Sequence, residues 1–162
     1  MRSFSILFAF FIFGLSSQVS GQVVLDIELR TIDGEYTTIS DLSGDRLTVL
    51  DFWATWCKPC MKSIPKLIEL SDQYEESVVQ FLGINIDSPR NLSKVSPLAR
   101  TLDIPYPVLL DTEQELYNEL LVASLPTLIV LDAYGEIVYV HEGFATGDET
   151  VIREELANLL AE

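Results

Sequence analysis

The sequence predicts one layered α/β domain built around a mixed β-sheet. Apolar runs with the length of buried strands alternate with helical segments, and a hairpin followed by a helix closes the chain. A length of 162 residues suits one domain, and a hydrophobic fraction of 48% is enough to fill its core. No long linker, internal repeat or low-complexity tract interrupts residues 22–162, so we expect a single unit there.

The strand predictions rest on apolar runs and on turn signals between them. Residues 47–52 form the compact run LTVLDF, which is typical of a strand buried on both faces. Asp33-Gly34 and Tyr134-Gly135 are turn signals between neighbouring strand candidates, so two hairpins are expected. The full set of expected strands is residues 23–32, 36–39, 47–52, 78–87, 106–110, 127–132 and 137–142.

The helix predictions rest on start signals. Pro59 suits the first position of a helix, where a missing N–H has no cost. Ser96-Pro97 is a second start signal, and Thr112 and Glu115 have the spacing of a capping box. We therefore expect helices at residues 59–74, in the later part of 88–102, at 112–121 and at 148–160.

The charge pattern excludes one class of partner. The formal net charge is −15, and no cluster of lysines and arginines stands out along the chain. Such a surface repels phosphate backbones and offers no site for counterion release. We therefore expect no nucleic-acid partner, and interpret the acidic residues as a solvated surface.

The first 21 residues have the pattern of an export signal. Arg2 is followed by an apolar run of about 12 residues and then by small and polar residues up to Gly21. A membrane-spanning helix needs roughly 20 apolar residues, so a permanent anchor is the weaker alternative, and a buried helix is another. We expect a signal peptide at residues 1–21, cleaved after Gly21, and an exported, periplasmic or otherwise extracytoplasmic domain at residues 22–162.

The chain has two cysteines, Cys57 and Cys60, with Lys58 and Pro59 between them. By loop entropy, a disulfide over so short a span adds about 2 kcal/mol to the free energy of unfolding. Loops of 15 to 100 residues add roughly 3 to 4.7 kcal/mol. Structural zinc takes four Cys or His ligands, and the sequence offers two cysteines and one histidine. The pair is therefore interpreted as a redox pair, with no metal and no cofactor beyond the disulfide itself.

The predicted position of the pair assigns a role to each cysteine. A thiol at a helix N-terminus faces unpaired backbone N–H groups and the positive end of the helix dipole, which favour its thiolate form. Lys58 adds a nearby positive charge. We predict that Cys57 attacks the substrate and that Cys60, about one turn into the helix, resolves the mixed disulfide.

Asp51 lies six residues before Cys57, inside the most apolar strand. Burial disfavours the charged form of a carboxyl group, so its pKa should be raised towards neutrality. Such a group can exchange protons near pH 7, which suits activation of Cys60 during resolution. The alternative is a strand-end aspartate whose oxygens are satisfied by backbone N–H groups.

Residues 52–60 (FWATWCKPC), with Pro65 beyond them and Leu125-Pro126-Thr127 downstream, resemble the thioredoxin superfamily. The N-terminal hairpin, residues 106–111 and the export signal resemble its extracytoplasmic branch, the TlpA/ResA-like disulfide reductases. The resemblance covers residues 23–160. It implies a thioredoxin-like fold, with a central mixed sheet flanked by helices and an extra N-terminal β-hairpin.

The resemblance also assigns residues around the cysteines. Pro126 matches the cis-proline that packs beside the disulfide. Leu125 before it keeps free backbone groups that can pair with an extended substrate segment. Trp56 matches an exposed tryptophan that contacts substrates, and Lys58 and Pro59 complete the expected substrate-binding set.

Two positions depart from the pattern of the extracytoplasmic relatives. Ser63 stands where many of them have glutamate, and Asp51 stands where they often have asparagine. The acid–base group is therefore expected on the strand, and the specialised cytochrome-maturation role of some relatives is not carried over. Trp53 is expected to pack beneath the site, and the single histidine, His141, to be a surface strand residue rather than a catalyst.

The sequence thus predicts a monomeric thiol–disulfide oxidoreductase that acts on protein disulfides or dithiols outside the cytoplasm, in the reducing direction. A separate electron-donor protein is implied, because no membrane domain is available to receive electrons. Three alternatives stay open: an oxidase or isomerase on the same fold, a thiol peroxidase, and a non-catalytic binding module or chaperone.

Overall fold

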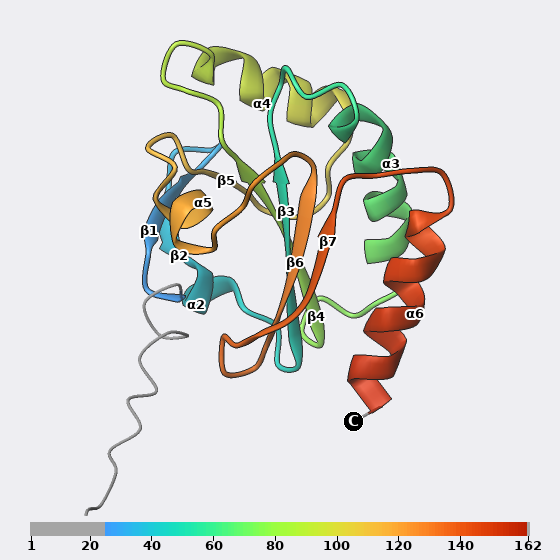
Figure 1. The fold of residues 1–162 in the computed structure, drawn as a ribbon. Coiled ribbons are helices and arrows are strands. Elements are labelled where there is room, and N and C mark those ends of the chain that lie inside the picture. Colours follow the sequence, from blue (N-terminus) through green and yellow to red (C-terminus); the bar gives the residue numbers. More distant parts are fainter. Residues whose placement is uncertain (1–24, 162) are drawn as a thin grey trace, which may run out of the picture.

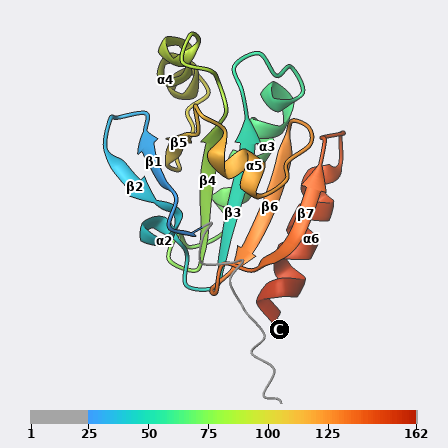
Figure 2. The same ribbon diagram turned by 60° about the vertical axis from the view of Figure 1, so that its left-hand side comes forward.

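The computed structural model describes residues 25–161, and this part of the chain forms a seven-stranded sheet flanked by helices (Figures 1 and 2). The strand order is β2-β1-β5-β4-β3-β6-β7. The strands are β1 (Glu28–Thr31), β2 (Tyr36–Thr38), β3 (Leu47–Trp53), β4 (Val79–Asn85), β5 (Val108–Leu110), β6 (Thr127–Asp132) and β7 (Ile137–Glu142).

The sheet is mixed, as predicted. β3, β4 and β5 run parallel to one another, whereas β6 is antiparallel to β3 and the two outer hairpins, β1–β2 and β6–β7, are antiparallel. β1 joins the sheet by antiparallel pairing with β5, which attaches the extra N-terminal hairpin. β3 is central, paired with β4 on one side and with β6 on the other.

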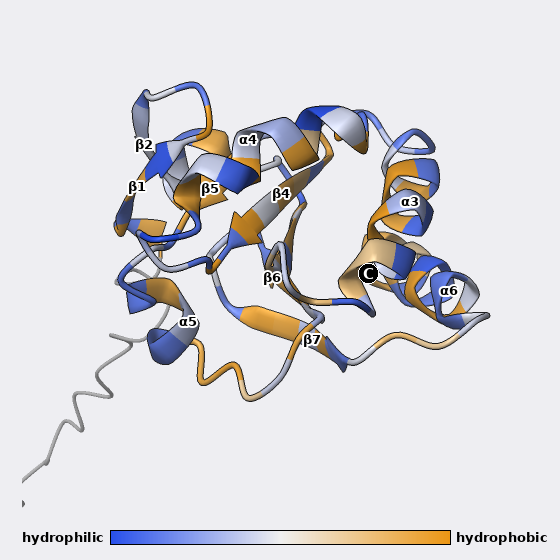
Figure 3. Ribbon diagram, turned by 90° about the horizontal axis from the view of Figure 1, so that it is seen from above, coloured by the Kyte–Doolittle hydropathy of each residue, from blue (hydrophilic) through white to orange (hydrophobic). Residues whose placement is uncertain are grey.

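Helices cover both faces of the sheet. They are α2 (Ile39–Leu42), α3 (Cys60–Ser71), α4 (Leu92–Thr101), α5 (Glu115–Glu119) and α6 (Asp148–Ala161). Seen from above, α3 and α6 lie together on one side of the strands, and α5 lies on the other (Figure 3). Figure 3 also shows the apolar sides of α3 and α6 turned towards the strands, which is the amphipathic arrangement of surface helices.

Alternation along the strands divides the core between the two faces. Beneath α3 and α6 lie Val49, Phe81 and Val130, with Leu67 and Leu70 from α3 and Ile152 and Leu156 from α6. On the opposite face lie Leu50, Phe52, Leu82 and Ile84, with Ile39 from α2, Val95 and Ala99 from α4 and Leu116 from α5. β3 is buried along its whole length, as its apolar run predicts.

Two predicted helix starts were wrong. α4 begins at Leu92, so Pro97 lies inside the helix instead of at its start. The earlier start places Val95 and Ala99, one turn apart, on the same buried face, and this burial outweighs the hydrogen bond that Pro97 cannot make.

The predicted capping box of α5 is also wrong. The N–H groups of Glu115 and Tyr117 donate instead to the carboxylate of Asp111, each at 2.8 Å. Gln114 is the N-cap residue in a left-handed conformation, with φ of 58°, so the helix starts later than Thr112 and is short. A buried aspartate thus satisfies the first N–H groups, which the sequence pattern assigns to a threonine.

The predicted export signal at residues 1–21 lies outside the described residues. Within residues 25–161, no helix is long and apolar enough to cross a membrane.

Candidate active site

Cys57 and Cys60 form a disulfide at the junction between β3 and α3, with their Cα atoms 5.3 Å apart. The loop after β3 is closed by a hydrogen bond from the Cys57 N–H to the carbonyl of Ala54 at 3.0 Å, and α3 begins at Cys60. Cys57 is 4% exposed and Cys60 is fully buried. The backbone N–H of Cys60 donates to the Cys57 sulfur at 3.2 Å, so the outer sulfur lies against a donor at the start of the helix.

Asp87 holds the loop that carries Cys57. Its carboxylate accepts the backbone N–H of Thr55 at 2.7 Å and the Thr55 hydroxyl at 2.8 Å, and the Asn85 side-chain amide donates to it at 3.0 Å. Asp87 is fully buried two residues after the end of β4, and the carboxyl ends of the parallel strands β3 and β4 meet at one edge of the sheet. Asp87 was not among the predicted site residues, although an acid at the end of a buried strand segment was a usable signal.

A groove of about 510 Å³ opens beside the disulfide. Its lining comprises Trp56, Cys57, Lys58, Pro59, Ile86, Tyr117, Ala123, Ser124 and Leu125. The structure therefore brings the four predicted substrate-binding residues together around Cys57. Trp56 is 60% exposed, so a large aromatic surface is available at the rim of the groove.

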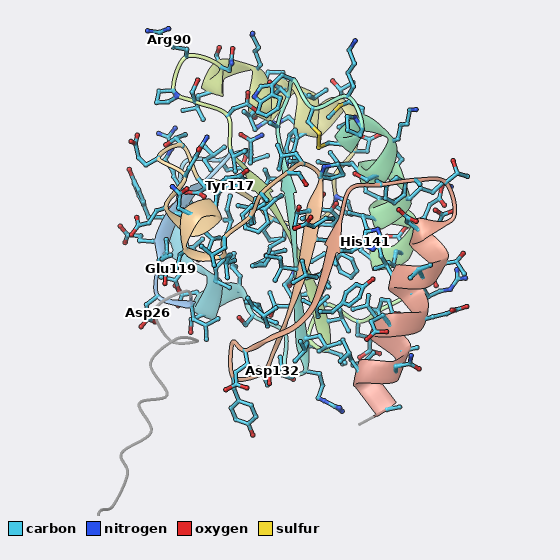
Figure 4. All side chains as sticks on the ribbon, viewed as in Figure 1. Asp26, Arg90, Tyr117, Glu119, Asp132 and His141 are labelled. Atoms are coloured by element: carbon cyan, nitrogen blue, oxygen red, sulfur yellow. A yellow bond between two sulfur atoms is a disulfide. The ribbon has the colours of Figure 1, made fainter. Side chains whose placement is uncertain are left out.

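Four residues of the groove were not predicted, and three elements bring them there. Ile86 follows β4, Tyr117 belongs to α5, and Ala123 and Ser124 precede Pro126. Figure 4 labels Tyr117 on α5, next to the centre of the sheet. Periodicity along the chain carries no signal for this set, because it is assembled by the packing of separate elements.

The Leu125–Pro126 peptide bond is cis, and Pro126 is buried. The Pro126 carbonyl accepts the N–H of Gly143 at 2.8 Å, which ties this segment to the end of β7. Within residues 25–161 the backbone N–H and carbonyl of Leu125 have no hydrogen-bond partner, and Leu125 lines the groove. Its backbone polar groups therefore lie beside the disulfide and remain available for pairing.

Asp51 is 2% exposed, and burial raises the pKa of its carboxyl group to about 7. Neither carboxyl oxygen has a hydrogen-bond partner among residues 25–161. The alternative in which backbone N–H groups satisfy this side chain is therefore wrong. Asp51 borders a small cavity of about 10 Å³, whose wall also includes Ser63, Pro126 and His141. The cavity has room for about one water molecule.

His141 is less exposed than predicted. Its side chain is 17% exposed, with Nε2 at 3.0 Å from the Asp148 carboxylate and Nδ1 at 3.2 Å from the Tyr139 hydroxyl. Figure 4 shows it between β7 and α6, so it joins the edge strand to the last helix. Trp53 is fully buried, in agreement with the packing role predicted for it.

The fold and the site together define a class: the protein is a thiol–disulfide oxidoreductase with a thioredoxin-like fold. Among residues 25–161, no group of three or more His, Cys, Asp or Glu side chains is placed to hold a metal ion. The chain belongs to the AhpC/TSA family, whose model matches residues 20–140.

Curated sequence relatives include a thioredoxin-like protein and proteins named thiol-disulfide oxidoreductases. The chain is 34% identical over 130 residues to the thioredoxin-like protein YneN of Bacillus subtilis, covering 80% of this chain and 75% of that protein. It is 30% identical to the thiol-disulfide oxidoreductase ResA of Geobacillus kaustophilus (80% and 72% covered) and 30% identical to the sporulation thiol-disulfide oxidoreductase A of B. subtilis (75% and 73% covered).

Solved structures share the fold. A putative thiol:disulfide interchange protein DsbE from Chlorobium tepidum matches with a TM-score of 0.76 and 24% identity, covering 85% of this chain and 94% of that one. StoA from B. subtilis matches with a TM-score of 0.66 and 28% identity, covering 79% and 93%.

Proposed function

We propose that this protein is a protein-disulfide reductase that acts outside the cytoplasm, with Cys57 as the nucleophile and Cys60 as the resolving cysteine. The observation that carries the assignment is the asymmetry of the pair. Cys57 lines the groove and is the less buried of the two, whereas Cys60 is enclosed. The Cys60 N–H at 3.2 Å supports a negative charge on the Cys57 sulfur once the disulfide is reduced.

In the first step, the Cys57 thiolate attacks one sulfur of the substrate disulfide. A bond forms between Cys57 and that sulfur, the substrate S–S bond breaks, and the other substrate sulfur leaves as a thiolate that takes a proton from solvent. In the second step, the Cys60 thiolate attacks the Cys57 sulfur. The Cys57–Cys60 bond forms, the second substrate sulfur leaves, and two electrons have passed to the substrate.

Cys60 needs a base in the second step because it is fully buried, where a thiol resists ionisation. Asp51 supports this role because burial brings the pKa of its carboxyl group to about 7, within reach of the working pH. Its cavity is bordered by Ser63, whose hydroxyl donates to the Cys60 carbonyl at 3.1 Å. We assign to Asp51 the acceptance of the Cys60 proton.

The groove supports an extended protein segment as the substrate. Leu125 presents free backbone groups beside the disulfide, as a strand edge does for an added strand. Trp56 supplies apolar contact area, and Lys58 and Pro59 complete the wall between the cysteines. Oxidised enzyme must be reduced again, so we propose a separate dithiol protein as the electron donor, and a monomer as the active form.

The proposed location rests on the sequence. Residues 1–21 have the pattern of a cleaved signal peptide, which would leave residues 22–162 as the mature domain in the periplasm or an equivalent compartment.

The roles of the two cysteines are tested by trapping. Cys60→Ser should accumulate a covalent complex with a disulfide-bonded protein such as insulin, visible on a non-reducing gel, because the attack occurs and resolution does not. Cys57→Ser is the matched control and should form no complex. A complex with Cys57→Ser alone would reverse the roles. Full activity of Cys57→Ser would instead indicate a binding module or chaperone.

The direction is tested by the equilibrium reduction potential of the mature domain, followed by tryptophan fluorescence in defined dithiol buffers. A value near about −270 mV supports the reductase, whereas about −120 to −180 mV would make it an oxidase or isomerase. Consumption of hydroperoxide faster than reduction of insulin would replace the proposal with a thiol peroxidase.

A further inference from the structure

Four buried side-chain atoms have no hydrogen-bond partner among residues 25–161, and they belong to only three residues. They are both carboxyl oxygens of Asp51, the indole Nε1 of Trp53 and the hydroxyl of Tyr106. Buried polar atoms are normally paired, because an unpaired one costs about 1–3 kcal/mol. Two hydrogen-bond donors and one carboxyl group without partners in the same core therefore need a common explanation.

Gly83 is the point where the three residues meet. It lies on β4, opposite Asp51 in the parallel pairing of β3 with β4. A Cβ atom at Gly83 would lie 3.2 Å from Nε1 of Trp53 and 3.6 Å from Cε2 of Tyr106, the ring carbon adjacent to the one that bears the hydroxyl. The missing side chain thus leaves room over β4 for the Trp53 indole and for the ring of Tyr106, from the segment before β5, beside the strand position that carries Asp51.

Electrostatics couples the same two groups. The pKa of the Tyr106 hydroxyl is raised well above its ordinary value, first by burial and then by the negative charge of Asp51. Two titratable groups face Asp51 from neighbouring elements: Tyr106 across Gly83, and His141 of β7 across the small cavity. α3 contributes Ser63 to that cavity and α6 contributes Ile152, and neither ionises in the working range. Both nitrogens of His141 already have partners, so Tyr106 is the free donor of the two.

We propose that Tyr106 is a positioning residue for Asp51: its hydroxyl, reaching over Gly83, donates a hydrogen bond through one bridging water molecule to the Asp51 carboxylate. Nε1 of Trp53 is the second donor to that water, which gives the water the three partners that buried waters usually have. This inference rests on the proposed function, because it concerns the proton that Asp51 exchanges with Cys60.

The donor matters in the resolution step. The Cys60 thiol proton passes to the Asp51 carboxylate, and the Cys60 thiolate then attacks the Cys57 sulfur. The Cys57–Cys60 bond forms as the bond from Cys57 to the substrate breaks, and the leaving thiolate takes a proton from solvent. Tyr106 keeps its own proton throughout. Its hydrogen bond favours the ionised form of Asp51, so that more of the enzyme carries the base at neutral pH.

Tyr106→Phe tests the contact with little change in packing, because the ring keeps its contact with Phe81, with centroids 6.0 Å apart. The pKa of Asp51 is measured in the oxidised protein from the infrared carboxyl band that Asp51→Asn removes. We expect Tyr106→Phe to raise this pKa by about 1 pH unit, a roughly tenfold change in the ionisation equilibrium. The pH profile of mixed-disulfide resolution should move upward by the same amount, with its plateau retained.

Tyr74→Phe is the matched control. Tyr74 stacks on the same Phe81, with centroids 6.4 Å apart, and Tyr74→Phe removes a hydroxyl that has no part in the contact. It should leave the pKa of Asp51 unchanged. An equal pKa in wild type and Tyr106→Phe would overturn the proposal, as would equal shifts in Tyr106→Phe and Tyr74→Phe.

A second variant keeps the test decisive if Tyr106→Phe folds poorly. Gly83→Ala places a methyl group 3.2 Å from Nε1 of Trp53 and 3.6 Å from the Tyr106 ring, so it should displace both donors and also raise the pKa of Asp51, and an unchanged value would overturn the contact. The infrared measurement needs no turnover. Absence of disulfide exchange in the wild type would therefore overturn the proposed function, and an unshifted pKa would overturn only the role of Tyr106.

Discussion

Replacing Asp51 with asparagine is expected to stabilise the oxidised protein at neutral pH. Burial disfavours the charge of this carboxyl group and raises its pKa from an ordinary value of 3.8 to about 7 in the folded protein. Between these two values the folded state holds a proton that the unfolded state has lost. The free energy of unfolding therefore falls as pH rises through this window.

The magnitude follows from the size of the shift. About 3 pH units at 1.36 kcal/mol per unit correspond to about 4 kcal/mol, fully present above pH 7 and absent below about pH 4. Asparagine has nearly the same shape and no charge, so Asp51→Asn removes this cost. The gain in the free energy of unfolding should rise by about 1.4 kcal/mol per pH unit from pH 5 to pH 7 and then level off.

The assay is denaturant unfolding of the oxidised wild type and variant at several values between pH 5 and pH 8, with the slope m compared to confirm two-state behaviour. A gain that is the same at pH 5 and pH 8, or no gain at pH 8, would refute the reasoning. Asp87→Asn is the matched control. That carboxylate accepts three hydrogen bonds, two from Thr55 and one from Asn85, and an amide cannot accept them all, so a loss of about 1–3 kcal/mol is expected.

Two further predictions concern the surface and the last helix. Trp56→Ala should raise KM for a protein disulfide by up to about tenfold without lowering the unfolding temperature, whereas Tyr134→Ala, an exposed aromatic in the β6–β7 turn, should change neither. Insulin-reduction kinetics and thermal unfolding check this pair, and a stability loss in Trp56→Ala would contradict it. The N–H of Ala145 and then His141 lower the pKa of Asp148, so its contribution to stability is present above the unfolded pKa and lost as pH falls through the folded one. Asp148→Asn should therefore lower the unfolding midpoint more at pH 7 than at pH 3, and an equal loss at both would contradict the assignment.

Local patterns along the chain determined much of this protein. The apolar run of β3 predicted a buried strand, and the cysteine pair directly after it predicted a redox site at a strand-to-helix junction. Asp51 was predicted to be buried with a raised pKa, because a carboxyl group inside an apolar strand has few other outcomes. Each of these predictions depends on a stretch of about ten residues. Within such a stretch, backbone geometry and the alternation of side chains between the two faces already constrain which residues are buried.

Tertiary structure alone decided which distant groups meet. Asp87 binds Thr55, 32 residues away in the chain, because β4 runs parallel to β3. Tyr106 meets the Trp53 indole over Gly83 only because β5 joins the sheet beside β4 and Gly83 has no side chain. Such contacts depend on strand order and register, which a pattern within one segment does not encode, because the partner lies 30 or more residues away.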